Sequence, residues 1–156
     1  MISAYELWIY LSNQLYMRTF PLFIESFSWI MNPEYFKTIF LISQMPESWP
    51  DEFAIITGNN PMDVQLSDQE NDLRNQRLYD KTRNKIFLNI IGSSPDRSHQ
   101  EPSFALTCSI KEAIQMGKEF EQRAVFYVRE GMLKLIECRS EKCEEIGNFE
   151  DRLLLS

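Results

Sequence analysis

The order of short apolar runs and helical segments is the feature that most constrains the fold of this chain. Runs typical of β-strands occur at 36–42, 53–57, 86–91, 103–108, 124–128 and 132–138. Ser67-Asp-Gln-Glu70 forms a capping box that opens one helix, and Ser109 opens a second. From Phe53 onward the order is therefore β-α-β-β-α-β, with an extra strand at each end. This order predicts an α+β domain, ferredoxin-like or related, with a mainly antiparallel sheet and helices on one face.

Three regions of different composition divide the chain. We assign 1–33 to an N-terminal helical segment, 34–139 to the α+β core domain and 140–156 to a charged C-terminal tail. The N-terminal segment reads as two helices, at roughly 3–18 and 21–31, apolar around most of their circumference. Polar residues and Pro21 interrupt it, so we expect no transmembrane segment. Its apolar surface is expected to pack on the domain itself, on a second copy in a homodimer, or on a protein partner or membrane surface.

Charge and cysteine content exclude several classes of protein. The chain has 16 basic and 23 acidic residues and a net charge of −7, which disfavours nucleic acid as a partner. Its three cysteines form no CxxC motif, so a reduced, cytoplasmic protein is the simplest interpretation. No nucleotide-binding or nucleophile-elbow motif occurs, and a single histidine argues against a zinc site. The sequence identifies no cofactor and predicts no metal site.

The stretch from Gly92 to Phe104 holds the best candidate for chemistry. It contains the only histidine, His99, between Asp96 and Glu101, where a loop enters a strand. His99, Glu101 and Ser103 share strand parity and so are expected on one face. Because a neighbouring carboxylate tunes the pKa of an imidazole and fixes its tautomer, we take His99, Glu101 and Asp96 as candidate catalytic residues. The alternative is that His99 and Glu101 pair only to close the loop.

Residues from other segments are expected to complete a ligand site. The candidate ligand-binding residues are Asn60, Asn71, Arg74, Ser103 and Gln122. The Arg74 guanidinium suits a carboxylate or phosphate, which indicates a small anionic ligand such as a nucleotide or phosphorylated metabolite. Whether the protein is an enzyme stays open. The other interpretation is a non-catalytic interaction or oligomerisation module that uses its apolar N-terminal helices, with the polar set as a structural hydrogen-bond network.

Several of these segments also resemble a known family. The residues that carry the resemblance are Phe53–Pro61, Leu66, Ser67, Asn71, Gly92–Asp96, His99, Glu101, Ser103, Phe120–Gln122 and Ala124–Phe126. In this order they are similar to a bacterial family of uncharacterised proteins, domain-of-unknown-function family 3293, whose pattern runs FxIITAxNP, LSxxxN, PDxSHxExS and FxQxAxF. The resemblance covers about Tyr35 to Cys138, and Gly58 replaces the usual alanine. It implies a small cytosolic bacterial protein and no established activity.

Overall fold

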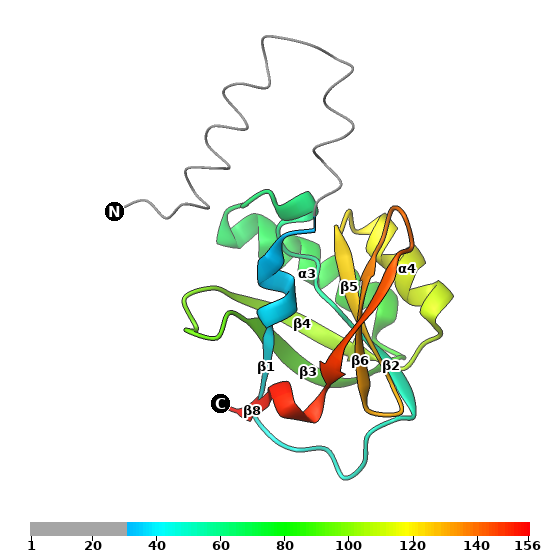
Figure 1. Ribbon diagram of the computed structural model, residues 1–156. Coiled ribbons are helices and arrows are strands. Elements are labelled where there is room, and N and C mark those ends of the chain that lie inside the picture. Colours follow the sequence, from blue (N-terminus) through cyan, green and yellow to red (C-terminus); the bar gives the residue numbers. More distant parts are fainter. Residues whose placement is uncertain (1–30) are drawn as a thin grey trace. The chain divides into compact units, whose positions relative to one another are not determined.

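The computed structural model describes residues 31–156 and is dominated by one eight-stranded sheet (Figure 1). The strands are β1 (Ile39–Ile42), β2 (Glu52–Ile56), β3 (Ile86–Ser93), β4 (Gln100–Leu106), β5 (Ala124–Arg129), β6 (Met132–Glu137), β7 (Cys143–Asn148) and β8 (Leu153–Leu155). The helices of this part are α3 (Asp68–Thr82), α4 (Ile110–Glu119) and three short 3-10 helices, η1 (Pro33–Lys37), η2 (Pro61–Asp63) and η3 (Glu150–Arg152). The two helices predicted before residue 32 lie outside the described residues.

The strand order is β7-β6-β5-β2-β4-β3-β1-β8. Neighbours pair antiparallel except β1 and β8, which run parallel. The prediction of a ferredoxin-like or related core is wrong, because the sheet has eight strands, is mixed and curls into a half-barrel. The segment assigned to a charged C-terminal tail, 140–156, contributes both edge strands of the sheet, β7 and β8.

The two faces of the sheet explain why it curls. One face packs against α3 and α4 through a helix-side cluster that includes Ile56, Leu78, Leu106 and Ile114. The opposite face is also apolar, and its members form an inner cluster: Phe40, Ile42, Phe53, Ile55, Ile90, Ala105, Val128, Leu133 and Phe149. A two-layer sandwich would leave this second face in water. Curling the sheet buries it without a second layer of helices.

The two edges of the sheet are joined by a short connection. β7 and β8 lie at opposite ends of the strand order, yet only residues 149–152 separate them in the chain. Phe149 in this connection is 2% exposed and contacts Phe40, Trp49 and Phe53, with ring centroids 5.5, 5.0 and 5.3 Å away. Arg152 donates to the carbonyls of Phe36 (2.7 Å), Thr38 (3.2 Å) and Ile146 (2.7 Å). It therefore ties β7 to the start of β1 across the seam.

Helix starts and one glycine set the spacing of the helix layer. The predicted capping box of α3 is confirmed: Ser67 Oγ accepts from Glu70 N and the Glu70 carboxylate accepts from Ser67 N. Ser109 and Glu112 form the same arrangement at α4. At the end of β2, a Cβ on Gly58 would lie 2.9 Å from the backbone of Arg74. Gly58 therefore lets α3 approach β2 closely. Neither α-helix in residues 31–156 has the length and apolar character needed to cross a membrane.

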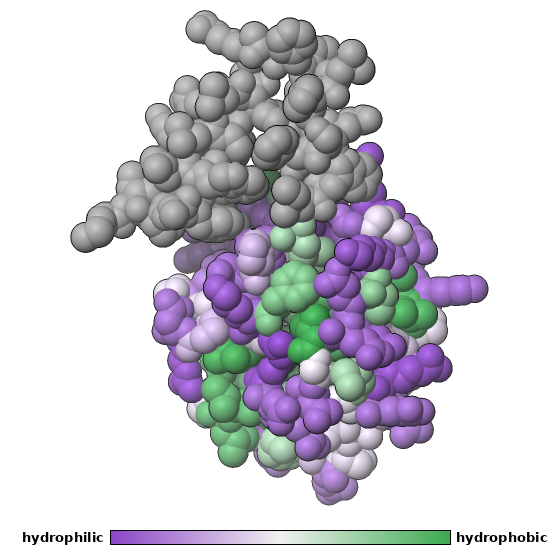
Figure 2. Space-filling view, in the orientation of Figure 1, coloured by the Kyte–Doolittle hydropathy of each residue, from purple (hydrophilic) through white to green (hydrophobic). Residues whose placement is uncertain are grey.

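The surface of this part is mostly hydrophilic on the face shown in Figure 2. An apolar group stands out near β8, where Met45, Leu154 and Leu155 are exposed. These side chains, with Glu150 and Leu153, line an open cavity of about 310 Å³. The cavity has one charged lining residue and no histidine or cysteine, so it offers a surface for apolar contact rather than for chemistry.

Candidate functional site

The loop between β3 and β4 is held rigid by Asp96. Its Oδ1 accepts from Ser94 Oγ (2.6 Å), from Ser98 N (3.0 Å) and from Ser98 Oγ (2.7 Å). These bonds, the one from Ser94 first, lower the pKa of Asp96 to about 2. Its hydrogen bonds within residues 31–156 go to these two serines and none goes to the His99 ring. Asp96 therefore orders the loop that delivers His99 to the start of β4.

His99 and Glu101 meet at the start of β4. His99 Nε2 lies 3.2 Å from Glu101 Oε1, which also accepts from Asn60 Nδ2 at 2.6 Å. The hydrogen bond to Glu101 raises the pKa of His99. The His99 side chain is 64% exposed and that of Glu101 only 24%. The imidazole is therefore the solvent-exposed member of the pair, and the carboxylate is partly buried. Since Glu101 shares strand parity with Ala105 of the inner cluster, the pair lies at the rim of the inner face.

Asn60 is itself held in place by the start of α3. Its backbone N–H donates to Asn71 Oδ1 at 2.9 Å, and its Oδ1 accepts from Asn71 Nδ2 (3.0 Å) and Leu66 N (3.1 Å). Asn71 is 7% exposed. A chain of hydrogen bonds therefore runs from the buried side of α3 through Asn60 and Glu101 to the exposed ring of His99.

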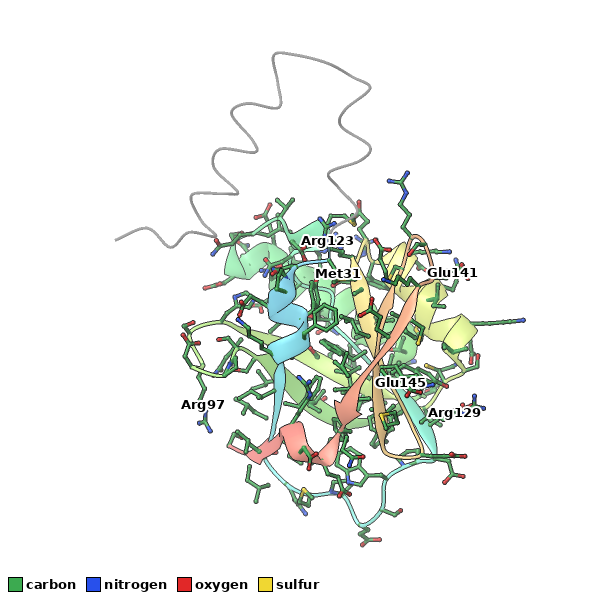
Figure 3. The ribbon with its side chains drawn as sticks, viewed as in Figure 1. Met31, Arg97, Arg123, Arg129, Glu141 and Glu145 are labelled. Atoms are coloured by element: carbon green, nitrogen blue, oxygen red, sulfur yellow. The ribbon has the colours of Figure 1, made fainter. Side chains whose placement is uncertain are left out.

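A second polar group adjoins this pair. Tyr35 in η1 donates to Asp63 Oδ1 at 2.6 Å, and Arg123 Nε donates to Asp63 Oδ2 in an ion pair. Burial raises the pKa of Tyr35 well above its usual value, and the charges of Asp63 and then Glu101 add to this shift. Asp63 also helps to raise the pKa of His99. Figure 3 shows Arg123 near η1. The His99–Glu101 pair and the cluster of Tyr35, Asp63 and Arg123 therefore interact electrostatically.

The backbone from Asn60 to Asp63, which joins the pair to this cluster, has unusual φ angles. Asn60, Met62 and Asp63 all have left-handed conformations, with φ of 45°, 51° and 63°. Left-handed φ raises the energy of a non-glycine residue by about 1–2 kcal/mol. Strain of this kind persists only where surrounding contacts hold it, and it clusters at functional sites. Here the contacts are those of Asn71 to Asn60 and of Tyr35 and Arg123 to Asp63.

Comparison with known proteins covers the same residues. Residues 56–125 match the model of a family described as "Protein of unknown function (DUF3293)". This segment belongs to the DUF3293 family. No curated protein and no solved structure matches the chain. The DUF3293 segment contains Asn60, Asp63, His99, Glu101 and Arg123, whereas Tyr35 lies before it.

Arg74 of the DUF3293 segment makes structural contacts. Its guanidinium donates to the carbonyls of Gly58 (2.7 Å) and Phe120 (2.5 Å) and pairs with Glu121 Oε2 at 3.2 Å. These bonds tie α3 to the end of β2 and to the end of α4. None of its hydrogen bonds to residues 31–156 reaches His99, Glu101 or Asp96.

Gln122 and Ser103 are likewise bonded within the fold. Gln122 Nε2 donates to the carbonyls of Asn59 (2.9 Å) and Phe120 (3.2 Å). Ser103 Oγ donates to the carbonyl of Glu101 at 3.0 Å. Within residues 31–156, every fully buried polar side-chain atom has a hydrogen-bond partner. Gln122 and Ser103 therefore brace the DUF3293 segment around the pair rather than face outward from it.

Sequence reasoning found one half of this polar region and missed the other. It named Asn60, Asn71, His99 and Glu101, which the structure connects through hydrogen bonds. It did not name Tyr35, Asp63 and Arg123, which come from three separate segments and carry no motif. The nearest available signal was the position of Arg123 beside Gln122 in the FxQxAxF segment. No group of three His, Cys, Asp or Glu residues within 31–156 is arranged to hold a metal ion.

Proposed function

We propose that the rim of the inner face is a small-molecule site in which His99, oriented by Glu101, accepts a proton and returns it. With Nε2 turned to Glu101, the other ring nitrogen, Nδ1, is the free acceptor. Carboxylate–imidazole pairs fix the tautomer of the ring and stabilise the imidazolium that forms when the proton is taken up. A positioned general base of this kind typically contributes about 10²–10⁴-fold to a rate.

One observation carries this proposal: Glu101 Oε1 is shared by the Asn60 amide and the His99 ring. A pair that only closes a loop needs no support from a buried helix residue. Here Asn71 holds Asn60, Asn60 holds Glu101, and the strained backbone of Asn60 is retained to do so. Support of an exposed reactive group by a rigid inner layer is what a preorganised site requires.

The anionic ligand expected from sequence is not part of this proposal. That expectation depended on Arg74, whose donors are taken up by Gly58, Phe120 and Glu121. The interaction-module alternative depends on residues 1–31, of which only Met31 is among the described residues. No described contact therefore favours it over the His99 site.

The proposal is tested by the reactivity of the full chain toward ethyl dichloroacetate, an ester that imidazole hydrolyses as a general base. The wild type should hydrolyse it faster than His99→Gln, with a rate that rises as His99 loses its proton. Glu101→Gln should lose most of this excess, because its amide cannot stabilise the imidazolium. Arg97→Gln is the matched control, since Arg97 lies two residues from His99 and points away from the sheet (Figure 3). Equal rates for wild type and His99→Gln would reject the proposal.

A further inference from the structure

Two acceptor atoms at the start of β4 have no hydrogen-bond partner within residues 31–156. Glu101 uses only Oε1 for Asn60 and His99, which leaves Oε2 unbonded. The same geometry leaves His99 Nδ1 unbonded. In residues 31–156, every fully buried polar side-chain atom of a non-exposed residue has a hydrogen-bond partner. Glu101 is only partly exposed, so its unbonded Oε2 is not fully buried and contacts solvent. The site thus presents two acceptors to solvent.

The arginines considered as anion ligands bond other residues or point away from the His99–Glu101 pair. Arg123 is paired with Asp63, and its side chain is 17% exposed. Arg74 donates to two carbonyls and to Glu121. Arg97, at the tip of the β3–β4 loop, extends away from the sheet (Figure 3). Within residues 31–156, a bound anion would therefore find no guanidinium that is free of other contacts and faces the pair.

Counting the charged groups of residues 31–156 alone, the site is negative when His99 is neutral. Glu101 and Asp63 each contribute −1, and Arg123 contributes +1, while Tyr35 stays protonated because burial and Asp63 raise its pKa. Both carboxylates act on the His99 ring. A negative site with free acceptors attracts a positively charged hydrogen-bond donor and repels an anion.

From this arrangement we infer that the His99–Glu101 site takes a ligand with a positively charged nitrogen donor, an ammonium or amidinium group. The donor binds Glu101 Oε2, and His99 Nδ1 accepts a second N–H or removes a proton from it. This inference rests on the proposed function, because it names the ligand class for the same site. It replaces the anion that the sequence suggested.

The test uses the full chain and acetamidinium chloride as the probe, followed by NMR of the His99 ring. Because His99 is the only histidine, its ring signals are unambiguous. Sodium phosphate and sodium chloride at the same ionic strength are the comparison salts. Acetamidinium should shift the ring signals saturably and lower the midpoint of the His99 titration, since a bound cation disfavours the imidazolium. A saturable response to phosphate, or none to acetamidinium, would overturn the ligand class.

Two carboxylate variants complete the experiment. Glu101→Gln should abolish the response to acetamidinium. Glu145→Gln on β7, where Glu145 pairs with Lys134 at 3.2 Å, should retain it. An equal response in both variants would contradict the inference. The same variants separate the two proposals: if Glu101→Gln leaves the His99 midpoint unchanged, the pair is absent in solution and the proposed function fails. If the midpoint falls but acetamidinium does not bind, only the ligand class fails.

Discussion

Replacing Arg152 by methionine should open the seam of the curled sheet. Methionine keeps much of the apolar stem of arginine but removes the donors that reach the carbonyls of Phe36, Thr38 and Ile146. A hydrogen bond from a charged donor contributes about 1.5–3 kcal/mol. Water can reach these part-buried carbonyls once the guanidinium is gone, so we take about 1 kcal/mol for each. The expected loss in the free energy of unfolding is therefore about 3 kcal/mol.

Urea unfolding followed by far-ultraviolet circular dichroism measures this loss. Arg129→Met is the matched control, because the Arg129–Glu52 pair spans 3.5 Å with side chains 62% and 39% exposed. An exposed pair of this kind should change stability by less than about 1 kcal/mol. Amide hydrogen exchange adds a local readout: Arg152→Met should speed exchange in β1 and β8 more than in β5 and β6. A loss no larger than that of Arg129→Met would refute the view that Arg152 closes the seam.

Three further predictions concern the core, the helix layer and the site. Phe149→Ala should lower the free energy of unfolding by about 3–5 kcal/mol in urea, because it empties the centre of the aromatic cluster. Gly58→Ala should lower it by about 1–3 kcal/mol and reduce the thermal midpoint, because the new Cβ meets the Arg74 backbone and α3 has to move. The bond to Glu101 raises the pKa of His99, so this pair stabilises the fold below about pH 6.5 and loses that contribution as pH rises through the raised value. The deficit of Glu101→Gln in urea unfolding should thus be larger at acidic than at alkaline pH, by no more than about 1 kcal/mol.

Local signals in the sequence predicted the elements well. The capping box at Ser67 and the N-cap serine at Ser109 placed both helix starts, because a helix N-terminus depends on a few neighbouring residues. Strand parity predicted that Glu101 and Ser103 share one face, because side chains alternate along any strand. These properties depend on a few neighbouring residues, so one sequence is enough to see them.

Contacts between distant segments were not accessible in the same way. Residues 140–156 were assigned to a charged C-terminal tail, yet residues 143–148 form the edge strand β7, where charged side chains face water. Tyr35 and Asp63 meet across 28 residues, and nothing near either of them signals the other. Arg74 was predicted to bind a ligand, but its guanidinium bonds the Gly58 carbonyl because α3 packs closely on Gly58.

The joining of the two sheet edges also has a consequence for how the chain acquires its structure. β1 takes β8 as one of its two partners, and Arg152 bonds a carbonyl 116 residues earlier in the chain. Contacts of such long sequence separation form slowly, because closing the intervening loop is entropically unfavourable. During synthesis the ring of Phe40 lacks the covering ring of Phe149 until residues 149–155 have left the ribosome. In that interval the aromatic face and the unpaired edge of β1 are exposed, and surfaces of this kind favour aggregation of incompletely folded chains.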